Sequence, residues 1–357
     1  MTKAAWPARE LCLLGAGART SLGIDLRSSA AAACSGIAEF SEHPFMVDLA
    51  GEPMVVARDP WLAAELEGDE RLAELVATAV DECLSAAGLV AGGRRWPLRL
   101  WLALSEAERA RTDGRAARVV SAVEEVLAGR YQLAGVSVLE HGHVAGAVAV
   151  CAAADAARAG YDGVCLVVGA DSWLDPVSLE WLDATGRLHS PVHPFGFVPG
   201  EAAAAVLLGP PHWAGPAGVA GWIAGGALSF EPDLAPELPR LGRALTHAAR
   251  EALADRNAAM PQVGTVYADL NGMPERADEL GYTIVRLAER MAPGFGTVTP
   301  VEWFGDVGAA SVPLMLALAG AGAAMGRVTG PALLLGQAIG GGRSALLMAL
   351  PDAGGRP

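Results

Sequence analysis

The stretch HVAGAVAVCAAADAARAG, residues 143–160, decides the fold that this sequence predicts. Its run of Ala, Val and Gly, closed by Arg158 and Gly160, predicts a helix with a surface of small residues. Such a surface lets a helix approach a sheet or another helix closely. A second helix of this kind, GAASVPLMLALAGAGAAMG, is expected at 308–326. We therefore expect both helices to lie between layers of the molecule and to pack against each other at its centre.

Strands and helices alternate around both segments, and GPPHWAGPAG (209–218) reads as a linker between two parts. The first part is expected to hold a strand running into a glycine turn (10–23), strands at 97–105, 136–140, 163–172 and 200–209, helices at 69–89, 116–129 and 143–160, and a polar loop at 175–199. The second part is expected to hold helices at 244–257, 275–291 and 308–326, a strand and turn at 265–272, and two strands at 331–350. This alternation predicts an α/β fold with covered sheets. The recurrence predicts a duplicated five-layer arrangement with halves 1–212 and 213–357.

Composition limits the function classes. Apolar residues make up 52% of the chain and charged residues 18%, which indicates a large core. The net charge is −14 and no Lys/Arg run occurs, so we expect no nucleic-acid partner. The longest apolar stretches are too short or too rich in Ala and Gly to span a membrane, and no signal peptide is evident. We expect no membrane partner.

The cysteines indicate a reducing compartment. There are five of them in apolar contexts, with no CxxC spacing: Cys12, Cys34, Cys83, Cys151 and Cys165. We expect buried, reduced thiols in a cytoplasmic protein. Gly15 and Gly17 look like the start of a dinucleotide fingerprint, but Thr20 stands at its third position and no acidic-ended second strand follows. We therefore expect no cofactor.

Three segments resemble the β-ketoacyl synthases of the thiolase superfamily. They are GAGARTSLG (15–23), HPFGFVPGEAAAAVLL (193–208) and QAIGGGRSALLMAL (337–350). The second is the most specific, because it is similar to the family's Gly-Phe-Val-x-Gly-Glu-Gly-Ala segment around Gly200 and Glu201. The resemblance extends over nearly the whole chain. It implies a thiolase-like duplicated five-layer α-β-α-β-α fold.

The resemblance also locates the family's catalytic positions. The family uses a Cys at the N-terminus of a buried helix as acyl acceptor, and two His residues assist decarboxylation and stabilise the oxyanion. Matching the glycine of the nucleophile motif to Gly146 places His143 where the Cys would stand. The segment DLNGMP (269–274) places Asp269 at the first His.

The second catalytic His is also replaced. WFGDVGAAS (303–311) places Gly305 at its position, or Asp306 if a one-residue gap is allowed. Cys34 lies in AACSGI (32–37), where the family has a loop, and Cys151 lies eight residues beyond His143, about 12 Å along a helix. Neither is expected to be a displaced nucleophile. We expect no condensing activity.

Three interpretations of the His141-Gly142-His143 pair remain open. A metal site would need a third ligand from Glu140, Asp269 or Asp306, although zinc usually takes more His or Cys. A residual enzyme would use neutral His143 beside Asp269 as a general base in acyl transfer or thioester hydrolysis. The interpretation that we favour has no metal and no condensation, so the chain would be a partner subunit in the manner of chain-length factors.

The resemblance implies a substrate site and partners. We expect His141, Gly305, Gly341 and Gly342 to line the substrate site. The expected partners are an acyl-carrier protein or acyl thioester, and a second chain. The apolar strand 136–140 would aggregate as an open edge, so we expect it to pair across a dimer axis. The dimer would be a homodimer or a heterodimer with a complete ketosynthase.

Overall fold

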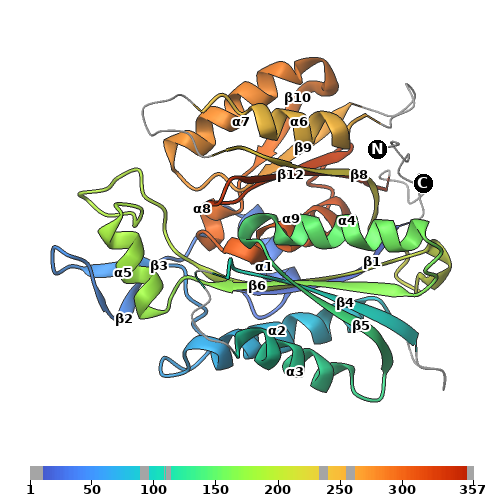
Figure 1. The fold of residues 1–357 in the computed structure, drawn as a ribbon, viewed down its shortest axis with the longest axis horizontal. Coiled ribbons are helices and arrows are strands. Elements are labelled where there is room, and N and C mark those ends of the chain that lie inside the picture. The colour runs from blue at the N-terminus through green and yellow to red at the C-terminus, as the bar shows by residue number, and fades with distance from the viewer. Residues whose placement is uncertain are drawn as a thin grey trace.

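The computed structural model describes residues 11–88, 96–107, 109, 114–232, 240–254 and 262–351. Figure 1 shows three helical layers separated by two layers of strands. From bottom to top in that view, the helices are α2 (Gly68–Ala86) with α3 (Arg115–Leu127), then α4 (Ala145–Arg158) with α9 (Ser311–Ala324), then α6 (Arg243–Ala252) with α7 (Pro274–Arg286). The five-layer α-β-α-β-α arrangement expected from the sequence is confirmed.

The two layers of strands are halves of one sheet. The lower layer holds β1 (Cys12–Thr20), β4 (Trp96–Leu104), β5 (Tyr131–Glu140), β6 (Val164–Ser172) and β7 (Glu201–Gly209). The upper layer holds β8 (Gly221–Phe230), β9 (Val263–Ala268), β10 (Met291–Val298), β11 (Ala332–Gln337) and β12 (Gly342–Ala349). The strand order is β10-β9-β11-β12-β8-β1-β7-β6-β4-β5. The layers join where β1 pairs with β8, through Cys12 with Trp222 and Leu13 with Gly221.

Strand order shows the internal duplication. When the strands are numbered within their own layer, both layers have the order 3-2-4-5-1 from the outer edge inward. In both, strands 3, 2 and 4 run parallel, and strand 5 runs antiparallel to its two neighbours. Because both layers share the same strand order and the same strand directions, each layer is one copy of the same folding unit. The chain boundary between the units, placed at residue 212, stays a prediction.

The two small-residue helices meet at the centre, as expected. A Cβ atom at Gly146 of α4 would lie 2.4 Å from the Cδ atom of Pro313 in α9, and one at Gly169 of β6 would lie 2.7 Å from Cγ of the same proline. Only glycine allows such close approach at these points. Each helix begins with a short 3-10 turn, Gly142–Val144 before α4 and Gly308–Ala310 before α9. The two turns therefore face each other in the central layer.

Gly15 and Gly17 do not form the glycine turn expected at the end of the first strand. Both lie inside β1, under α2. A Cβ atom would lie 2.5 Å from the Cys83 carbonyl oxygen at Gly15, and 2.2 Å from the Ala79 carbonyl oxygen at Gly17. The glycines therefore let α2 pack directly on the strand, which explains why the dinucleotide-like spacing carries no phosphate-binding turn.

The segment 175–199, expected to be a loop, contains the helix α5 (Pro176–Ala184). Asp175 caps it by accepting a hydrogen bond from the Ser178 backbone N–H, and Pro176 occupies its first turn. This capping signal was present in the sequence. The helix is short and most of its residues are apolar, so the sequence shows no clear helical spacing of apolar and polar residues.

Other segments were unassigned or bounded differently. The helix expected over 275–291 ends at Arg286, and Met291 begins β10. β8 and β10 are rich in Gly and lack the alternating pattern of a strand. Elements that the pattern did not indicate are α1 (Leu26–Cys34), β2 (Ser41–Val47), β3 (Pro53–Val56) and α8 (Val301–Phe304). Within the described ranges, no helix combines the length and apolar character that crossing a membrane requires.

We expect Gly17→Ala to lower the free energy of unfolding by about 1–3 kcal/mol, because the added Cβ would force α2 away from β1. Gly281→Ala in α7 is the matched control, because a Cβ there meets nothing within 4 Å. It should leave stability unchanged or raise it by about 0.5–1 kcal/mol through helix propensity. Urea unfolding followed by circular dichroism measures both. Equal stability of the two variants would contradict the packing role of Gly17.

Candidate functional site

His143 sits at the start of the central layer. It lies in the 3-10 turn that leads from β5 into α4, and its residue is 1% exposed. Gly142 before it has φ of +54°, a conformation that glycine adopts without strain. A Cβ atom at Gly142 would also lie 2.1 Å from Oε1 of Glu106. The positive φ is the main reason why this turn favours a glycine, since the end of the Glu106 side chain could shift away from a Cβ.

Asp306 is the partner of His143. Its Oδ1 lies 2.7 Å from His143 Nε2 and accepts hydrogen bonds from the Gly308 backbone N–H at 2.9 Å and from Trp173 Nε1 at 3.2 Å. Its Oδ2 accepts from Asn271 Nδ2 at 2.8 Å. An ionised carboxylate only accepts, so His143 Nε2 carries a hydrogen and donates it. The contact orients the imidazole and fixes which nitrogen holds the proton.

Asp269 lies in the same buried cluster but does not hydrogen-bond to His143. Its Oδ2 accepts from the Gln337 backbone N–H at 2.7 Å, while its Oδ1 has no partner among the described residues. Arg276 Nη1 donates to the Asp269 backbone carbonyl at 2.8 Å, and Arg276 Nη2 lies 3.3 Å from His143 Nε2. Because Nε2 already donates to Asp306, this last contact is a close approach of two donors. The expected pairing of His143 with Asp269 is thus replaced by a pairing with Asp306.

The two carboxyl groups have pKa values shifted in opposite directions. Burial would raise the pKa of Asp306, but the charges of His143 and Arg276 and the Gly308 N–H lower it far below its usual value. Burial raises the pKa of Asp269, and the attraction of Arg276 and His143 only partly offsets that effect. Asp306 is therefore the ionised member of the cluster, and Asp269 is the member for which a charge is costly.

The cluster lies behind a neighbouring pocket. This pocket, of about 300 Å³, is lined by Trp173, which is fully buried and whose ring centroid lies 6.4 Å from that of His143. His143 is not among the lining residues, and its Nδ1 has no partner among the described residues. The imidazole is thus separated from the pocket by an indole.

The expected substrate-lining residues are dispersed. His141 is exposed, while His143 is buried, so the two do not share a site. A Cβ atom at Gly305 would lie 2.8 Å from the Val198 carbonyl oxygen and 2.9 Å from Cβ of Ala57, so this glycine packs against those two residues. Gly341 packs against the Glu231 carbonyl.

Gly342 of that expected set packs against the His143 turn, because a Cβ there would lie 2.9 Å from the Val144 side chain. Among the described residues, no three His, Cys, Asp or Glu side chains are placed to hold a metal ion, and Glu140 is exposed. Cys34 is exposed at the end of α1, and burial raises the pKa of the Cys151 thiol to about 12. Neither thiol touches the cluster.

Sequence reasoning missed several members of the cluster. Asn271 lies two residues after Asp269 in the segment already singled out, so its amide could have been proposed. Arg276 follows in the first turn of α7, and Trp173 follows β6, but no spacing connects either with His143. These contacts exist only because the ends of β6 and β9 and the start of α4 converge in the folded chain.

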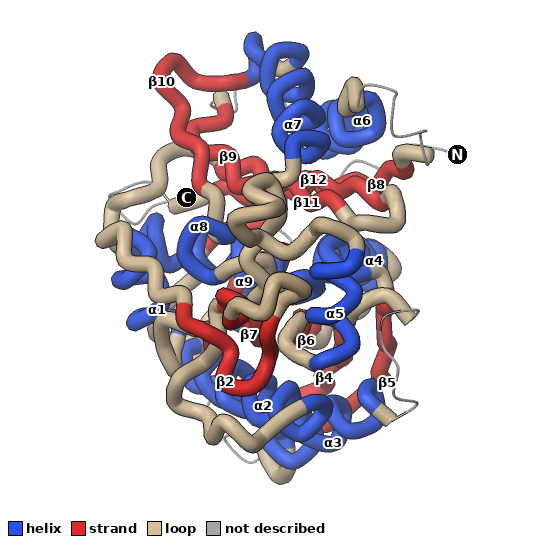
Figure 2. The backbone as a smooth tube through the Cα atoms, turned by 90° about the vertical axis from the view of Figure 1, so that its left-hand side faces the viewer, coloured by secondary structure: helices blue, strands red, loops and turns tan. Residues whose placement is uncertain are grey.

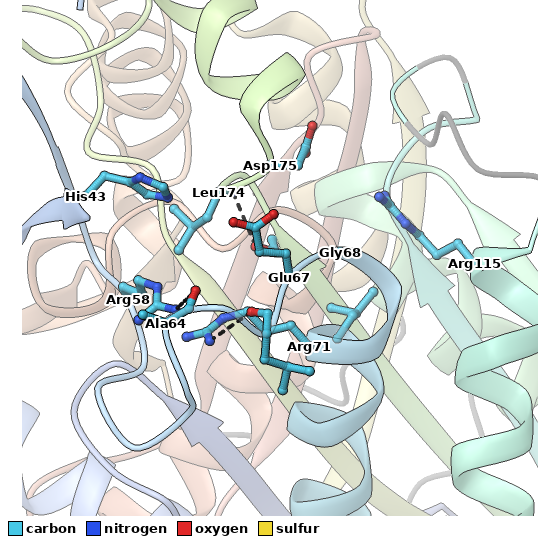
Figure 3. A pocket seen from close by; sticks show the side chains of 12 residues that line it. His43, Arg58, Ala64, Glu67, Gly68, Arg71, Arg115, Leu174 and Asp175 are labelled. Carbon is cyan, nitrogen blue, oxygen red and sulfur yellow. Dashed lines mark hydrogen bonds between the residues drawn. The ribbon is translucent and has the colours of Figure 1, made fainter. Parts of the chain in front are cut away.

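A second, much smaller cavity lies by the end of β6 and the start of α2. Figure 3 shows His43 and Arg58 on one side of it and Arg115 on the other. Its volume is about 30 Å³, room for about one water molecule. Arg71 Nη2 donates to Glu201 Oε1 at 2.6 Å, and both side chains are at most 4% exposed. Glu201, the glutamate of the most specific sequence segment, thus anchors α2 to β7 and has a structural role here.

Comparison with known proteins identifies the fold. No protein-family model and no curated protein matches the chain. A complex of a type II polyketide synthase acyl-carrier protein with its ketosynthase bound to the hexaketide is similar, with a TM-score of 0.80 at 16% identity over 96% of this chain and 100% of that one. The ishigamide ketosynthase/chain length factor gives 0.72 at 17% identity over 96% and 99%, and a β-ketoacyl synthase from Burkholderia phymatum gives 0.75 at 15% over 97% and 100%. At these identities the likeness shows the fold.

Asp306→Asn should lower the free energy of unfolding at pH 7 by about 3–5 kcal/mol, because it leaves His143 and Arg276 without their ionised partner. Asp269→Asn is the matched control and should cost less, because the charged form of Asp269 is already disfavoured by burial. Urea unfolding of both variants measures the difference. A larger loss in Asp269→Asn would contradict the assignment of Asp306 as the charged partner.

The free energies of unfolding of the same two variants should depend on pH in different ways. The folded-state pKa of Asp306 is lowered, so its contribution is present above about pH 4, the ordinary aspartate value, and is lost as the pH falls below it. The folded-state pKa of Asp269 is raised, so its contribution is present in acid and is lost as the pH rises through that value. Asp306→Asn should therefore weaken the acid sensitivity of folding, whereas Asp269→Asn should not.

Proposed function

We propose that this chain, with the fold of β-ketoacyl synthases, is a non-condensing protein of fatty-acid or polyketide-type biosynthesis that binds acyl groups and serves as a partner subunit. One observation carries the proposal. The turn at the start of α4, where the resemblance places the nucleophilic Cys, holds His143, whose Nε2 is bound to Asp306 and whose residue is 1% exposed.

The charge of the cluster supports this proposal. Condensation requires a thiolate that accepts the acyl group, and groups that stabilise negative charge on a developing oxyanion. Here the position of the thiol carries an imidazole, and Asp306 adds a buried negative charge within 2.7 Å of it. A carboxylate at that distance opposes the negative charge of an oxyanion. The remaining position, Gly305, has no side chain to donate a hydrogen bond.

The pocket supports acyl binding. It opens between α5 and the Ile339-Gly340 turn, and its wall is formed mainly by apolar side chains. Pockets of a few hundred Å³ with such walls and a few polar groups are typical of small-molecule sites. A ketosynthase with the same fold is bound to its acyl-carrier protein. We take an acyl-carrier protein or an acyl thioester as the partner that delivers the acyl group.

A second candidate function is hydrolysis of an acyl thioester. Asp306 accepts a hydrogen bond from Nε2 of His143, and Nδ1 has no partner among the described residues, so a neutral His143 would have the arrangement of a general base. Nδ1 would take a proton from water, the hydroxide oxygen would bond to the thioester carbon, and the C–S bond would break with return of the proton to sulfur. Trp173 would have to move for water to reach Nδ1, so we place this function second.

Purified protein incubated with acyl- and malonyl-carrier protein should give no 3-oxoacyl product and no acyl adduct, as measured by intact mass spectrometry. The reason is the absence of a thiol at position 143. A complete ketosynthase is the positive control. A 3-oxoacyl product, or an adduct on Cys34 or Cys151, would overturn the proposal. Release of free acid that disappears in His143→Gln and Asp306→Asn would favour the hydrolase instead.

We further propose that β5 pairs with a second chain. It forms one end of the sheet, and Val136 and Val138 on it are 41% and 38% exposed. An open apolar edge of this kind invites pairing with another strand. The second chain is a copy of this one in the purified protein and a complete ketosynthase in the chain-length-factor role.

Val138→Lys should convert the dimer to a monomer, because it places a charge in the apolar contact beside the paired edge. Val285→Lys is the control, since Val285 is 75% exposed and belongs to α7, a helix that Figure 1 shows at the opposite side of the molecule from β5. Sedimentation equilibrium at micromolar concentration distinguishes the two states. A stable monomer of the unsubstituted chain, alone and with a complete ketosynthase, would remove the basis for this pairing.

A further inference from the structure

The pocket beside the His143 cluster has an unusual wall. The wall includes two tryptophans, two aliphatic residues, a glutamate and an arginine, which are Trp173, Trp181, Val177, Ile339, Glu106 and Arg109. Figure 2 places α5, which contributes Val177 and Trp181, on the face turned toward the viewer, beside β2. The pocket therefore lies between an outer helix and the central layer.

The apolar part of the wall is flat. The rings of Trp173 and Trp181 are nearly parallel, with 9° between their planes and 6.4 Å between centroids. The guanidinium carbon of Arg109 lies 3.5 Å from the centroid of the Trp173 ring, so it covers one indole with another flat group. Flat π-surfaces make offset-stacked or edge-to-face contacts with another π-system that a puckered aliphatic ring cannot reproduce.

The polar end of the pocket has unused hydrogen-bonding groups. Arg109 donates one nitrogen to Asp171, while its Nε and Nη1 have no partner among the described residues. Oε1 of Glu106 likewise has none. These two donors and one acceptor are buried beside the pocket without a hydrogen-bond partner among the described residues, and a ligand with a carbonyl oxygen next to an N–H group would satisfy them.

Charge decides between a neutral ligand and an anion. The carboxylate of Asp171 already neutralises Arg109, and Glu106 adds a second carboxyl group to the same end of the pocket. A free carboxylate in the ligand would meet this carboxyl group without an unpaired cation to balance it. The polar end therefore favours a neutral carbonyl compound.

We propose that this pocket binds a flat, neutral acyl group, aromatic or conjugated, whose carbonyl oxygen accepts from Arg109. The inference rests on the acyl binding proposed above and names the class of acyl group. Stacking against Trp181, whose side chain is partly exposed and whose ring is parallel to that of the buried Trp173, selects a planar body over a saturated one. The pairing of Arg109 with Asp171 selects the neutral acyl form over the free acid.

Three inert probes test both selections by isothermal titration calorimetry: cinnamamide, 3-cyclohexylpropanamide and cinnamate. The two amides have equal numbers of carbon atoms and differ in planarity, whereas cinnamamide and cinnamate differ in charge. Cinnamamide should bind about 2- to 13-fold more tightly than 3-cyclohexylpropanamide, the range expected for aromatic stacking. It should also bind more tightly than cinnamate.

Trp181→Leu should remove the preference for the planar amide, because it deletes one indole from a side chain that is already 39% exposed. Trp61→Leu is the matched control, since Trp61 is 54% exposed and does not line the pocket. If Trp181→Leu fails to fold, the ratio of the two amides in the unsubstituted protein decides alone.

Equal or weaker binding of cinnamamide, or no binding of any probe, overturns the inference about the pocket. Neither result bears on condensation, since the probes cannot react. A 3-oxoacyl product in the carrier-protein experiment would instead overturn the proposed function and leave the amide ratio as measured. The two failures are therefore distinguishable.

Discussion

The carboxylate of Asp306 is the point on which the centre of the molecule depends. It collects hydrogen bonds from His143 before α4, Trp173 after β6, Asn271 after β9 and Gly308 before α9. Its backbone also pairs with the segment before β7. The Asp306 N–H donates to the Val198 carbonyl at 2.8 Å, and the Asp306 carbonyl accepts from the Gly200 N–H at 2.9 Å. Five segments from both halves of the chain therefore meet at one buried anion. Removing the carboxyl group would leave several donors unsatisfied together.

The close packing of the central layer brings together the groups that surround the Asp306 carboxylate. A Cβ atom at Gly146 would lie 2.4 Å from the Pro313 side chain, and one at Gly169 would lie 2.6 Å from the Ala309 carbonyl oxygen, so both glycines allow close packing of α4 and β6 on α9 and on the turn before it. This packing places the 3-10 turns of Gly142–Val144 and Gly308–Ala310 side by side. His143 and Asp306 can then bridge from one turn to the other. A larger residue at either glycine would separate the halves and the cluster with them.

The chemistry of the cluster follows from which groups are charged. Asp306 supplies the cluster with a buried negative charge, which lies beside His143 and Arg276. The neighbouring pocket keeps an apolar wall and unused donors at Arg109. A buried ion-paired cluster beside a pocket with an apolar wall supports the acyl binding proposed above and the preference proposed for flat acyl groups.

The sequence by itself determined the class of fold, because small residues at 143–160 and 308–326 and the alternating apolar runs are local features that packing rules convert into layers. It also indicated that positions 143, 269 and 305 carry no Cys or His pair suited to condensation. It did not reveal β8 or β10, because their glycines interrupt the alternation of apolar and polar residues that marks a strand. It also did not reveal the helix α5, which is short and shows no clear helical spacing of apolar residues. Only the tertiary structure decided that His143 pairs with Asp306 rather than Asp269, and that Trp173, Asn271 and Arg276 join them. The physical reason is that these partners lie between 30 and 163 residues from His143 along the chain, and their contact depends on how two sheet layers and two helices converge, which no local pattern encodes.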